Sequence, residues 1–272
     1  MKEQNYAIGV FDSGLGGLTV VRAIRRELPH EDIHYFGDIA RLPYGIKSKK
    51  QIIEFSKQNT EFLIKKKIKA LVVACNSSAS ASLDVLRKTF PLPIVDVITP
   101  AAQLAVDVTS RHRVGVIGTT ATVESHAYQK EIQSLNAKIR VIEKACPLFV
   151  PLVEAGWLDH PVTTSVAREY LKSILRTGID TLILGCTHYP LLNKTIKKVA
   201  GDRVALIDSA PSTSKRLKEV LERRGLLKDA NGYNGKLTGK LNVYVSDLPR
   251  NFLKIGEQFL GQKIDRIETV SV

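Results

Sequence analysis

The stretch ALVVACNS at residues 70–77 decides the fold. The stretch TLILGCTH at residues 181–188 has the same pattern of residue types. Each is an apolar run that ends at a cysteine and is followed by residues with short polar side chains. Such a run is typical of a strand buried on both faces in a parallel sheet. Open α/β sheets bind their ligands at the carboxyl ends of the strands, where Cys75 and Cys186 are expected. A small molecule between the two halves could therefore meet one thiol on each side.

The remaining periodicity predicts an α/β protein whose second half repeats the plan of the first. Further strands are predicted at 6–11, 33–36, 94–97, 139–142, 204–207, 241–245 and 264–269, helices at 20–28, 49–67, 163–175, 191–199, 209–224 and 249–260, and a loop at 229–239. The stretch 113–120 is a strand that enters a turn of small residues, as the stretch 8–13 does. This alignment places Thr119 opposite Ser13, and both are candidate ligand contacts.

We predict two pseudo-symmetric domains, each a mainly parallel sheet flanked by helices, with the active site between them. The last segment contains no third cysteine strand and is expected to return to the first half. The first domain would then consist of residues 1–96 plus 208–272, and the second of residues 97–207.

Composition limits the compartment and the partners. The chain has 272 residues, of which 44% are apolar and 25% charged, and no run of eighteen apolar residues occurs. A membrane span is therefore not expected, and the polar N-terminus does not have the form of a secretion signal, so we expect a cytoplasmic protein. Three cysteines, an odd number, favour free thiols over a disulfide framework.

The formal net charge of +13 raises the question of a nucleic-acid partner. The lysines and arginines are dispersed, with small groups at 47–50, 65–69 and 194–198 that fall on predicted helices. Solvated helix faces explain this pattern, and a positive field could also attract an anionic substrate. We therefore expect neither a nucleic acid nor a membrane as partner.

The first predicted strand runs into the loop DSGLGG at residues 12–17. Its glycines allow the backbone to approach a ligand, but the loop is neither a P-loop nor a complete dinucleotide fingerprint. Asp12 is informative, since a carboxylate just past a buried strand is unfavourable unless it is paired. It could hold a substrate ammonium group or orient a group that transfers a proton.

Other polar residues follow the remaining strands. Asp38 ends a strand, and the turn Pro43-Tyr44-Gly45 after it presents backbone amides that can receive a carboxylate, although a plain connecting loop is the alternative. Glu154 is either a surface acid or a site acid. Residues 76–78 are expected to cap the next helix, and Cys146 is expected to be a small buried hydrophobe.

Two cysteines at equivalent strand ends suggest proton transfer on both faces of one carbon. One would act as thiolate base and the other as thiol acid, and the result is inversion of a stereocentre. A thiol with a pKa of about 8.5 needs roughly 2 kcal/mol of stabilisation to ionise near pH 7. We expect helix N-termini to contribute, with His188 assisting Cys186 and Asp12 assisting Cys75. The alternative is that both cysteines are buried core thiols.

Five motifs together resemble the bacterial glutamate racemase family. They are DSGLGG at 12–17, PYG at 43–45, ACN at 74–76, CPL at 146–148 and GCTHYP at 185–190. The resemblance covers residues 8–259 and implies interconversion of L- and D-glutamate, which supplies D-glutamate for peptidoglycan synthesis, without a cofactor or a metal. It also implies that Cys75 is the base toward D-glutamate, that Cys186 is the base toward L-glutamate, and that Asp12 and His188 assist.

The same resemblance implies a set of substrate contacts and a homodimer. The contacts are Asp12, Ser13, Tyr44, Gly45, Asn76, Ser77, Thr187 and His188, with Asp38 and Glu154 as further acids whose roles stay open. The family usually has Thr where this chain has Ser77, so one methyl contact is lost while the hydroxyl is kept.

Three other functions remain open at this stage. A racemase for aspartate or another acidic amino acid is the nearest, although His188 favours glutamate. An amide hydrolase with a cysteine nucleophile would need only one of the two thiols. A binding module that uses the basic surface would show no turnover of amino acids.

Overall fold

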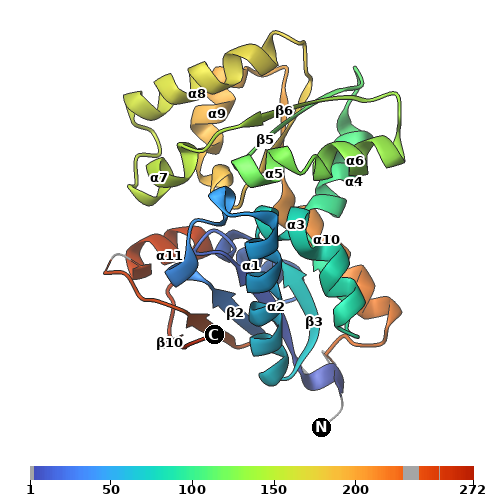
Figure 1. The fold of residues 1–272 in the computed structure, drawn as a ribbon, viewed down its shortest axis with the longest axis vertical. Coiled ribbons are helices and arrows are strands. Elements are labelled where there is room, and N and C mark those ends of the chain that lie inside the picture. The colour runs from blue at the N-terminus through green and yellow to red at the C-terminus, as the bar shows by residue number, and fades with distance from the viewer. Residues whose placement is uncertain (1–2, 229–238, 251) are drawn as a thin grey trace.

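The computed structural model describes residues 3–228, 239–250 and 252–272, and it consists of two lobes, each built on a parallel sheet (Figure 1). The strands of the larger sheet are β1 (Ala7–Asp12), β2 (Ile33–Gly37), β3 (Ile68–Val73), β4 (Ile94–Asp96), β9 (Leu241–Val245) and β10 (Ile267–Thr269). Those of the smaller sheet are β5 (Arg113–Gly118), β6 (Arg140–Ala145), β7 (Thr181–Gly185) and β8 (Ala205–Asp208).

The two sheets repeat one strand order. The larger sheet reads β10-β9-β2-β1-β3-β4, and the smaller reads β6-β5-β7-β8. The series β2-β1-β3-β4 thus matches β6-β5-β7-β8 strand for strand, and β9 and β10 extend the larger sheet beyond β2. The predicted α/β fold with two similar halves is confirmed, and β3 and β7 occupy equivalent places in it.

The cysteine strands are buried along their whole length. Every residue of β3 and of β7 is buried, and strands buried on both faces have such nearly continuous apolar sequences. Lys69 is the exception in β3, and its ammonium group is paired with the Glu31 carboxylate and donates to the Gln4 carbonyl oxygen at 2.7 Å. A buried cation needs such partners. Lys69 therefore links β3 to Glu31 and to the N-terminal segment at Gln4.

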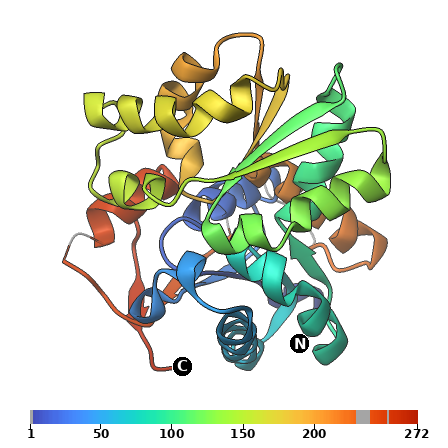
Figure 2. The same ribbon diagram turned by 45° about the horizontal axis from the view of Figure 1, so that its top comes forward.

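Helices cover both faces of each sheet. In the first lobe these are α1 (Leu18–Glu27), α2 (Lys49–Lys65), α3 (Asn76–Thr89), α10 (Ser209–Arg223) and α11 (Phe252–Leu260). In the second they are α4 (Ile98–Val108), α5 (Thr120–Glu124), α6 (Ala127–Leu135), α7 (Phe149–Glu154), α8 (Pro161–Leu175) and α9 (Asn193–Ala200). Short 3-10 turns lie at Glu3–Asn5, Ile39–Arg41, Tyr44–Ile46 and Tyr189–Leu192. Figure 2 shows α8 and α9 on one side of the smaller sheet and α4 and α6 on the other.

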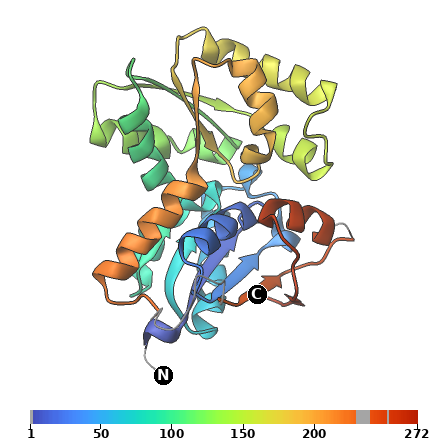
Figure 3. The ribbon, with the colours of Figure 1, turned by 180° about the vertical axis from the view of Figure 1, so that it is seen from behind.

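The chain passes between the lobes at two aspartates in equivalent positions. Asp96, at the end of β4, accepts hydrogen bonds from the first amides of α4, and Asp208, at the end of β8, caps α10 in the same way. Figure 3 shows α10 running from the second lobe down the back of the first, where it packs on α1. A division of domains at 96/97 and 207/208 stays a prediction.

Some local expectations need correction. Residues 76–78 do not cap α3 but form its first turn, and Cys75 occupies the N-cap position without a side-chain bond to the helix. The last strand begins at Ile267, since the segment from Ile264 is not yet paired with β9. The expected loop at 229–239 lies outside the described residues except for Gly239.

Candidate active site

A cavity of about 470 Å³ lies between the lobes, where the strands of both sheets end. It contains both cysteines, one from each sheet, and most of the predicted contacts. The predicted residues in its lining are Ser13, Tyr44, Gly45, Cys75, Asn76, Ser77, Thr119, Glu154, Cys186, Thr187 and His188. Asp12 and Asp38 are not among the lining residues. A larger hollow of about 800 Å³ lies beside α3 and α6, and no cysteine or histidine of the described part of the chain lines it.

Part of the lining was not predicted from the sequence. Leu42, Pro43, Ile46, Pro147, Val150 and Pro151 form an apolar wall, and Thr120 adds a polar residue. Two of these residues belong to motifs in the sequence, Pro147 to CPL and Pro43 to PYG, and these motifs were the available signals for the wall. Such apolar residues are indistinguishable from core residues until the two lobes are brought together.

The side of the cavity formed by the first lobe, here called the Cys75 wall, keeps the Cys75 thiol protonated. Cys75 lies in the turn between β3 and α3, and its thiol donates to the Ser13 hydroxyl at 3.5 Å. Burial raises the pKa of Cys75 to about 11, and the charge of Asp12 adds to this, although Ser13 and Ser78 act against it. We expected Asp12 and the helix N-terminus to lower this pKa. That prediction was wrong, because burial and the charge of Asp12 raise the pKa of Cys75.

Asp12 lies behind the cavity and connects the two walls. It is fully buried, accepts a hydrogen bond from the Gly14 amide at 3.0 Å, and accepts another from the Thr187 hydroxyl at 3.5 Å. Burial raises the pKa of Asp12, while the positive charge of His188 and the loop amides oppose that shift. Asp12 is therefore joined to the cavity lining through Thr187.

The wall at Cys186 contains a positive charge. The Nδ1 atom of His188 lies 3.9 Å from the Cys186 sulfur, and its Nε2 atom lies 3.2 Å from the Glu154 carboxylate. Burial lowers the pKa of His188, but the hydrogen bonds to Cys186 and Glu154 outweigh burial and raise it to about 10. The imidazole is consequently an imidazolium at neutral pH. The ring of Phe259, from α11, packs edge-on against the imidazole ring.

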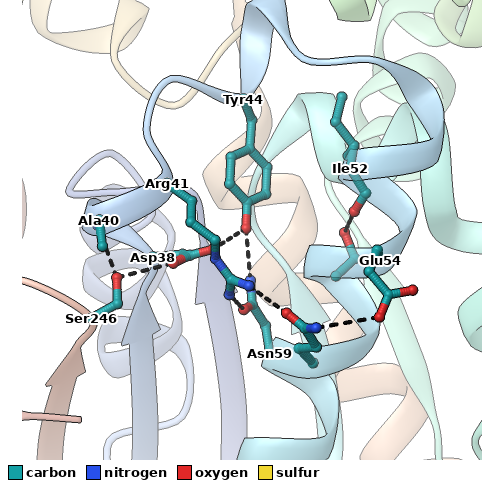
Figure 4. Close-up of polar contacts among 10 residues, drawn as sticks. Asp38, Ala40, Arg41, Tyr44, Ile52, Glu54, Asn59 and Ser246 are labelled. Atoms are coloured by element: carbon teal, nitrogen blue, oxygen red, sulfur yellow. Dashed lines mark hydrogen bonds and ion pairs between the residues drawn. The ribbon is translucent and has the colours of Figure 1, made fainter. Parts of the chain in front are cut away.

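Asp38 supports the cavity wall through Tyr44 (Figure 4). Its buried carboxylate accepts hydrogen bonds from the Tyr44 hydroxyl, from Arg41 Nε at 2.6 Å, and from the Ser246 hydroxyl at 2.9 Å. Asn59 donates to the Tyr44 oxygen at 3.2 Å and accepts from Arg41 at 2.8 Å. This network holds the turn at Tyr44–Ile46 against α2.

Polar contacts join the lobes around the rest of the cavity. The hydroxyls of Ser77 and Thr119 lie 2.9 Å apart, so the hydroxyl of Ser77 makes a hydrogen bond between the lobes. Gly16 and Gly45 allow the lobes to approach closely. A Cβ atom at Gly16 would lie 2.1 Å from Thr187 Oγ1, and one at Gly45 would lie 2.7 Å from Thr119 Cβ.

The third cysteine has a different environment. Cys146 is fully buried, does not line the cavity, and has its pKa raised to about 12 by burial. The prediction that it is a small buried hydrophobe is confirmed. Among the described residues, no group of three or more histidines, cysteines, aspartates or glutamates is placed to hold a metal ion.

The fold and the paired thiols define an amino-acid racemase, and comparison with known proteins agrees. A model of the Asp/Glu/Hydantoin racemase family matches residues 8–217. The glutamate racemase of Geobacter metallireducens is 46% identical over 98% of this chain and 97% of its own length. That of Neisseria meningitidis serogroup A is 48% identical over 97% and 96%.

Solved structures agree with these relatives. Glutamate racemase from Francisella tularensis, crystallised in complex with D-glutamate, superimposes with a TM-score of 0.91 at 40% identity and covers 98% of both chains. The chain belongs to the glutamate racemase family.

No helix in the described part of the chain is both long and apolar enough to cross a membrane.

Proposed function

We propose that this protein interconverts L- and D-glutamate by proton transfer at Cα between two cysteines, and that it supplies D-glutamate for peptidoglycan. The observation that carries the proposal is the presence of Cys75 and Cys186, from equivalent strand ends of two similar sheets, in one cavity. A single nucleophile would need only one of them.

The reaction requires one thiolate and one thiol at a time. The thiolate removes the Cα proton, the electron pair remains on the substrate as a carbanion, and the opposite thiol donates its proton to the other face. After one turnover the first cysteine is a thiol and the second a thiolate. Cys186 would remove the proton from L-glutamate, and Cys75 would remove it from D-glutamate.

The two walls support different resting states. The imidazolium of His188, 3.9 Å from Cys186, can stabilise negative charge on that sulfur, and Glu154 holds the ring in place. The raised pKa of Cys75 keeps it as the proton donor. This arrangement suits removal of the proton of L-glutamate by Cys186, and Asp12 opposes a second negative charge at Cys75.

Substrate would be held largely by neutral donors. Within the described ranges, no lysine or arginine lines the cavity. The substrate carboxylates would therefore meet the hydroxyls of Ser13, Ser77 and Thr187, the amides at Tyr44 and Gly45, and Asn76. The N-terminus of the 14-residue helix α3 adds a favourable dipole there. The Glu154 carboxylate offers a partner for the ammonium group.

Circular dichroism of L-glutamate, D-glutamate and L-aspartate, incubated with the protein and without added pyridoxal phosphate, tests the proposal. Loss of optical activity from both glutamate enantiomers, much faster than from aspartate, is expected. A faster reaction with aspartate would favour the alternative racemase, and a stable thioester with no racemisation would favour an amide hydrolase.

Two further parts of the proposal concern the whole protein. We infer a cytoplasmic homodimer, because the proposed product enters a cytoplasmic biosynthesis and the family resemblance implies a dimer. Light scattering during gel filtration tests the dimer, and a mass of one chain at micromolar concentration would contradict it.

A further inference from the structure

Tyr128 reaches the site from the opposite lobe. It is the second residue of α6, and its hydroxyl donates to the Oδ1 atom of Asn76 at 2.7 Å. Asn76 directly follows Cys75 and lines the cavity. Both side chains are almost fully buried, so this bond is shielded from water and joins the second lobe to the first beside one catalytic thiol.

The ring of the same tyrosine lies against the other cysteine strand. A Cβ atom at Gly185, the residue before Cys186, would lie 3.1 Å from Tyr128 Cε2. Gly185 thus leaves room for the ring. Tyr128 therefore touches the strand end at Cys186 with its ring and the segment after Cys75 with its hydroxyl.

The Asn76 amide has one partner and one unsatisfied group. Its oxygen accepts from Tyr128, while its Nδ2 atom is buried and has no partner among the residues that the structure describes. A buried donor without a partner is unfavourable, and a substrate carboxylate in the cavity would satisfy it. Burial raises the pKa of Tyr128 well above its ordinary value, so the phenol stays protonated and continues to donate.

We propose that Tyr128 is a positioning residue whose hydroxyl fixes the Asn76 amide so that its NH₂ group faces a substrate carboxylate. Without this bond the amide can turn its oxygen toward the carboxylate, which repels it. The inference rests on the proposed function. It means that Tyr128 of the second lobe helps to bind a substrate carboxylate that Asn76 of the first lobe contacts.

Kinetics of Tyr128→Phe in both directions test the inference, with Tyr170→Phe as the control. Tyr170 lies on α8 in the same lobe, and its hydroxyl accepts from the Leu148 amide at 3.2 Å. We expect Tyr128→Phe to raise the KM for both enantiomers about tenfold, since a bond to a carboxylate is charge-assisted, and to leave kcat within about threefold. Tyr170→Phe should leave both constants unchanged.

A double-variant cycle separates positioning from general destabilisation. In an Asn76→Ala background, Tyr128→Phe should cause no further rise in KM. An unchanged KM for Tyr128→Phe, or an equal rise in both backgrounds, would overturn the inference. If wild-type protein racemises no glutamate in this assay, the proposed function fails instead, so the two failures are distinguishable.

Asn76→Asp provides a second route if Tyr128→Phe does not fold. Aspartate can still accept from Tyr128 but presents an oxygen to the substrate in place of the NH₂ group. We expect glutamate binding to weaken at least 100-fold by calorimetry, because like charges then face each other. Wild-type affinity in Asn76→Asp would show that the amide donor is not used, and would refute the inference.

Discussion

The two walls of the cavity differ in charge although they derive from equivalent strands. Cys75 lies beside a carboxylate and hydroxyls, and burial raises its pKa to about 11. Cys186 lies beside an imidazolium that Glu154 holds in place. The backbone repeat provides two thiols at matching positions, and the neighbouring side chains then distinguish them. Opposite faces of a molecule in the cavity would therefore meet chemically different groups.

The largest expected effect comes from removing either thiol. Cys75→Ser and Cys186→Ser should each reduce racemisation by about 1,000-fold or more, because a hydroxyl is a much weaker acid and base than a thiol. Cys146→Ala is the matched control and should retain activity, since that cysteine does not line the cavity. Substantial activity in either serine variant would mean that one thiol is sufficient.

Removing the imidazolium takes away the charge that distinguishes the Cys186 wall from the Cys75 wall. His188→Asn is expected to lower kcat/KM about 100-fold. The two enantiomers have equal free energies, so kcat/KM must fall equally in both directions. The asymmetry appears in the isotope effect, which should grow more for 2-deuterated L-glutamate than for the D-enantiomer.

The exposed residue His160 provides a control, and His160→Asn should behave as wild type. Equal isotope effects for both enantiomers of His188→Asn would contradict a role for His188 specific to Cys186.

The high pKa of His188 predicts an alkaline limit. A raised pKa means that the imidazolium persists from neutral pH up to about 10 and is lost above it. The kcat/KM of the wild type should fall above about pH 10, and this limb should be absent from His188→Asn. If kcat/KM already fell near pH 7, His188 would lose its proton there, and the contacts with Cys186 and Glu154 would not raise its pKa.

Asp38 is expected to act through Tyr44 and not by proton transfer. Asp38→Asn loses the ion pair with Arg41 and should raise KM about tenfold, because the Tyr44 turn is less firmly held. The same substitution should add little in a Tyr44→Phe background. A fall in kcat with unchanged KM would instead identify Asp38 as a catalytic acid.

The smallest expected effect is on stability. Burial raises the pKa of Asp12, so its stabilising contribution is present at low pH and is lost as the pH rises through the folded-state pKa. Asp12→Asn should therefore melt a few degrees higher than wild type at pH 8 while losing activity. Asp159→Asn, at an exposed position, controls for the change in charge, and a lower melting temperature for Asp12→Asn would contradict the burial argument.

The sequence predicted the sheets better than the helices between them. The strands β3 and β7 were recognisable because they are buried on both faces and end in cysteine. The helices α4, α5, α6 and α7 were not predicted. α4 is rich in alanine, so its buried and exposed faces differ little in polarity, and α5 has only five residues.

The site residues could be named from motifs, but their electrostatics could not. The pKa of Cys75 depends on burial beneath the other lobe, and that of His188 depends on Glu154, which lies 34 residues away. Tyr128 belongs to no motif near a cysteine, and its contact with Asn76 exists only because the lobes meet. Interactions between distant segments have no counterpart in local sequence patterns.

Initial-rate racemisation of protiated L-glutamate in deuterium oxide tests the central claim most directly. If two different cysteines act on opposite faces, the first D-glutamate formed carries solvent deuterium at Cα, while the remaining L-glutamate is still largely protiated. Mass spectrometry after separation of the enantiomers measures both. D-glutamate that retains the original proton would mean that a single base returns it, and would contradict the two-cysteine mechanism.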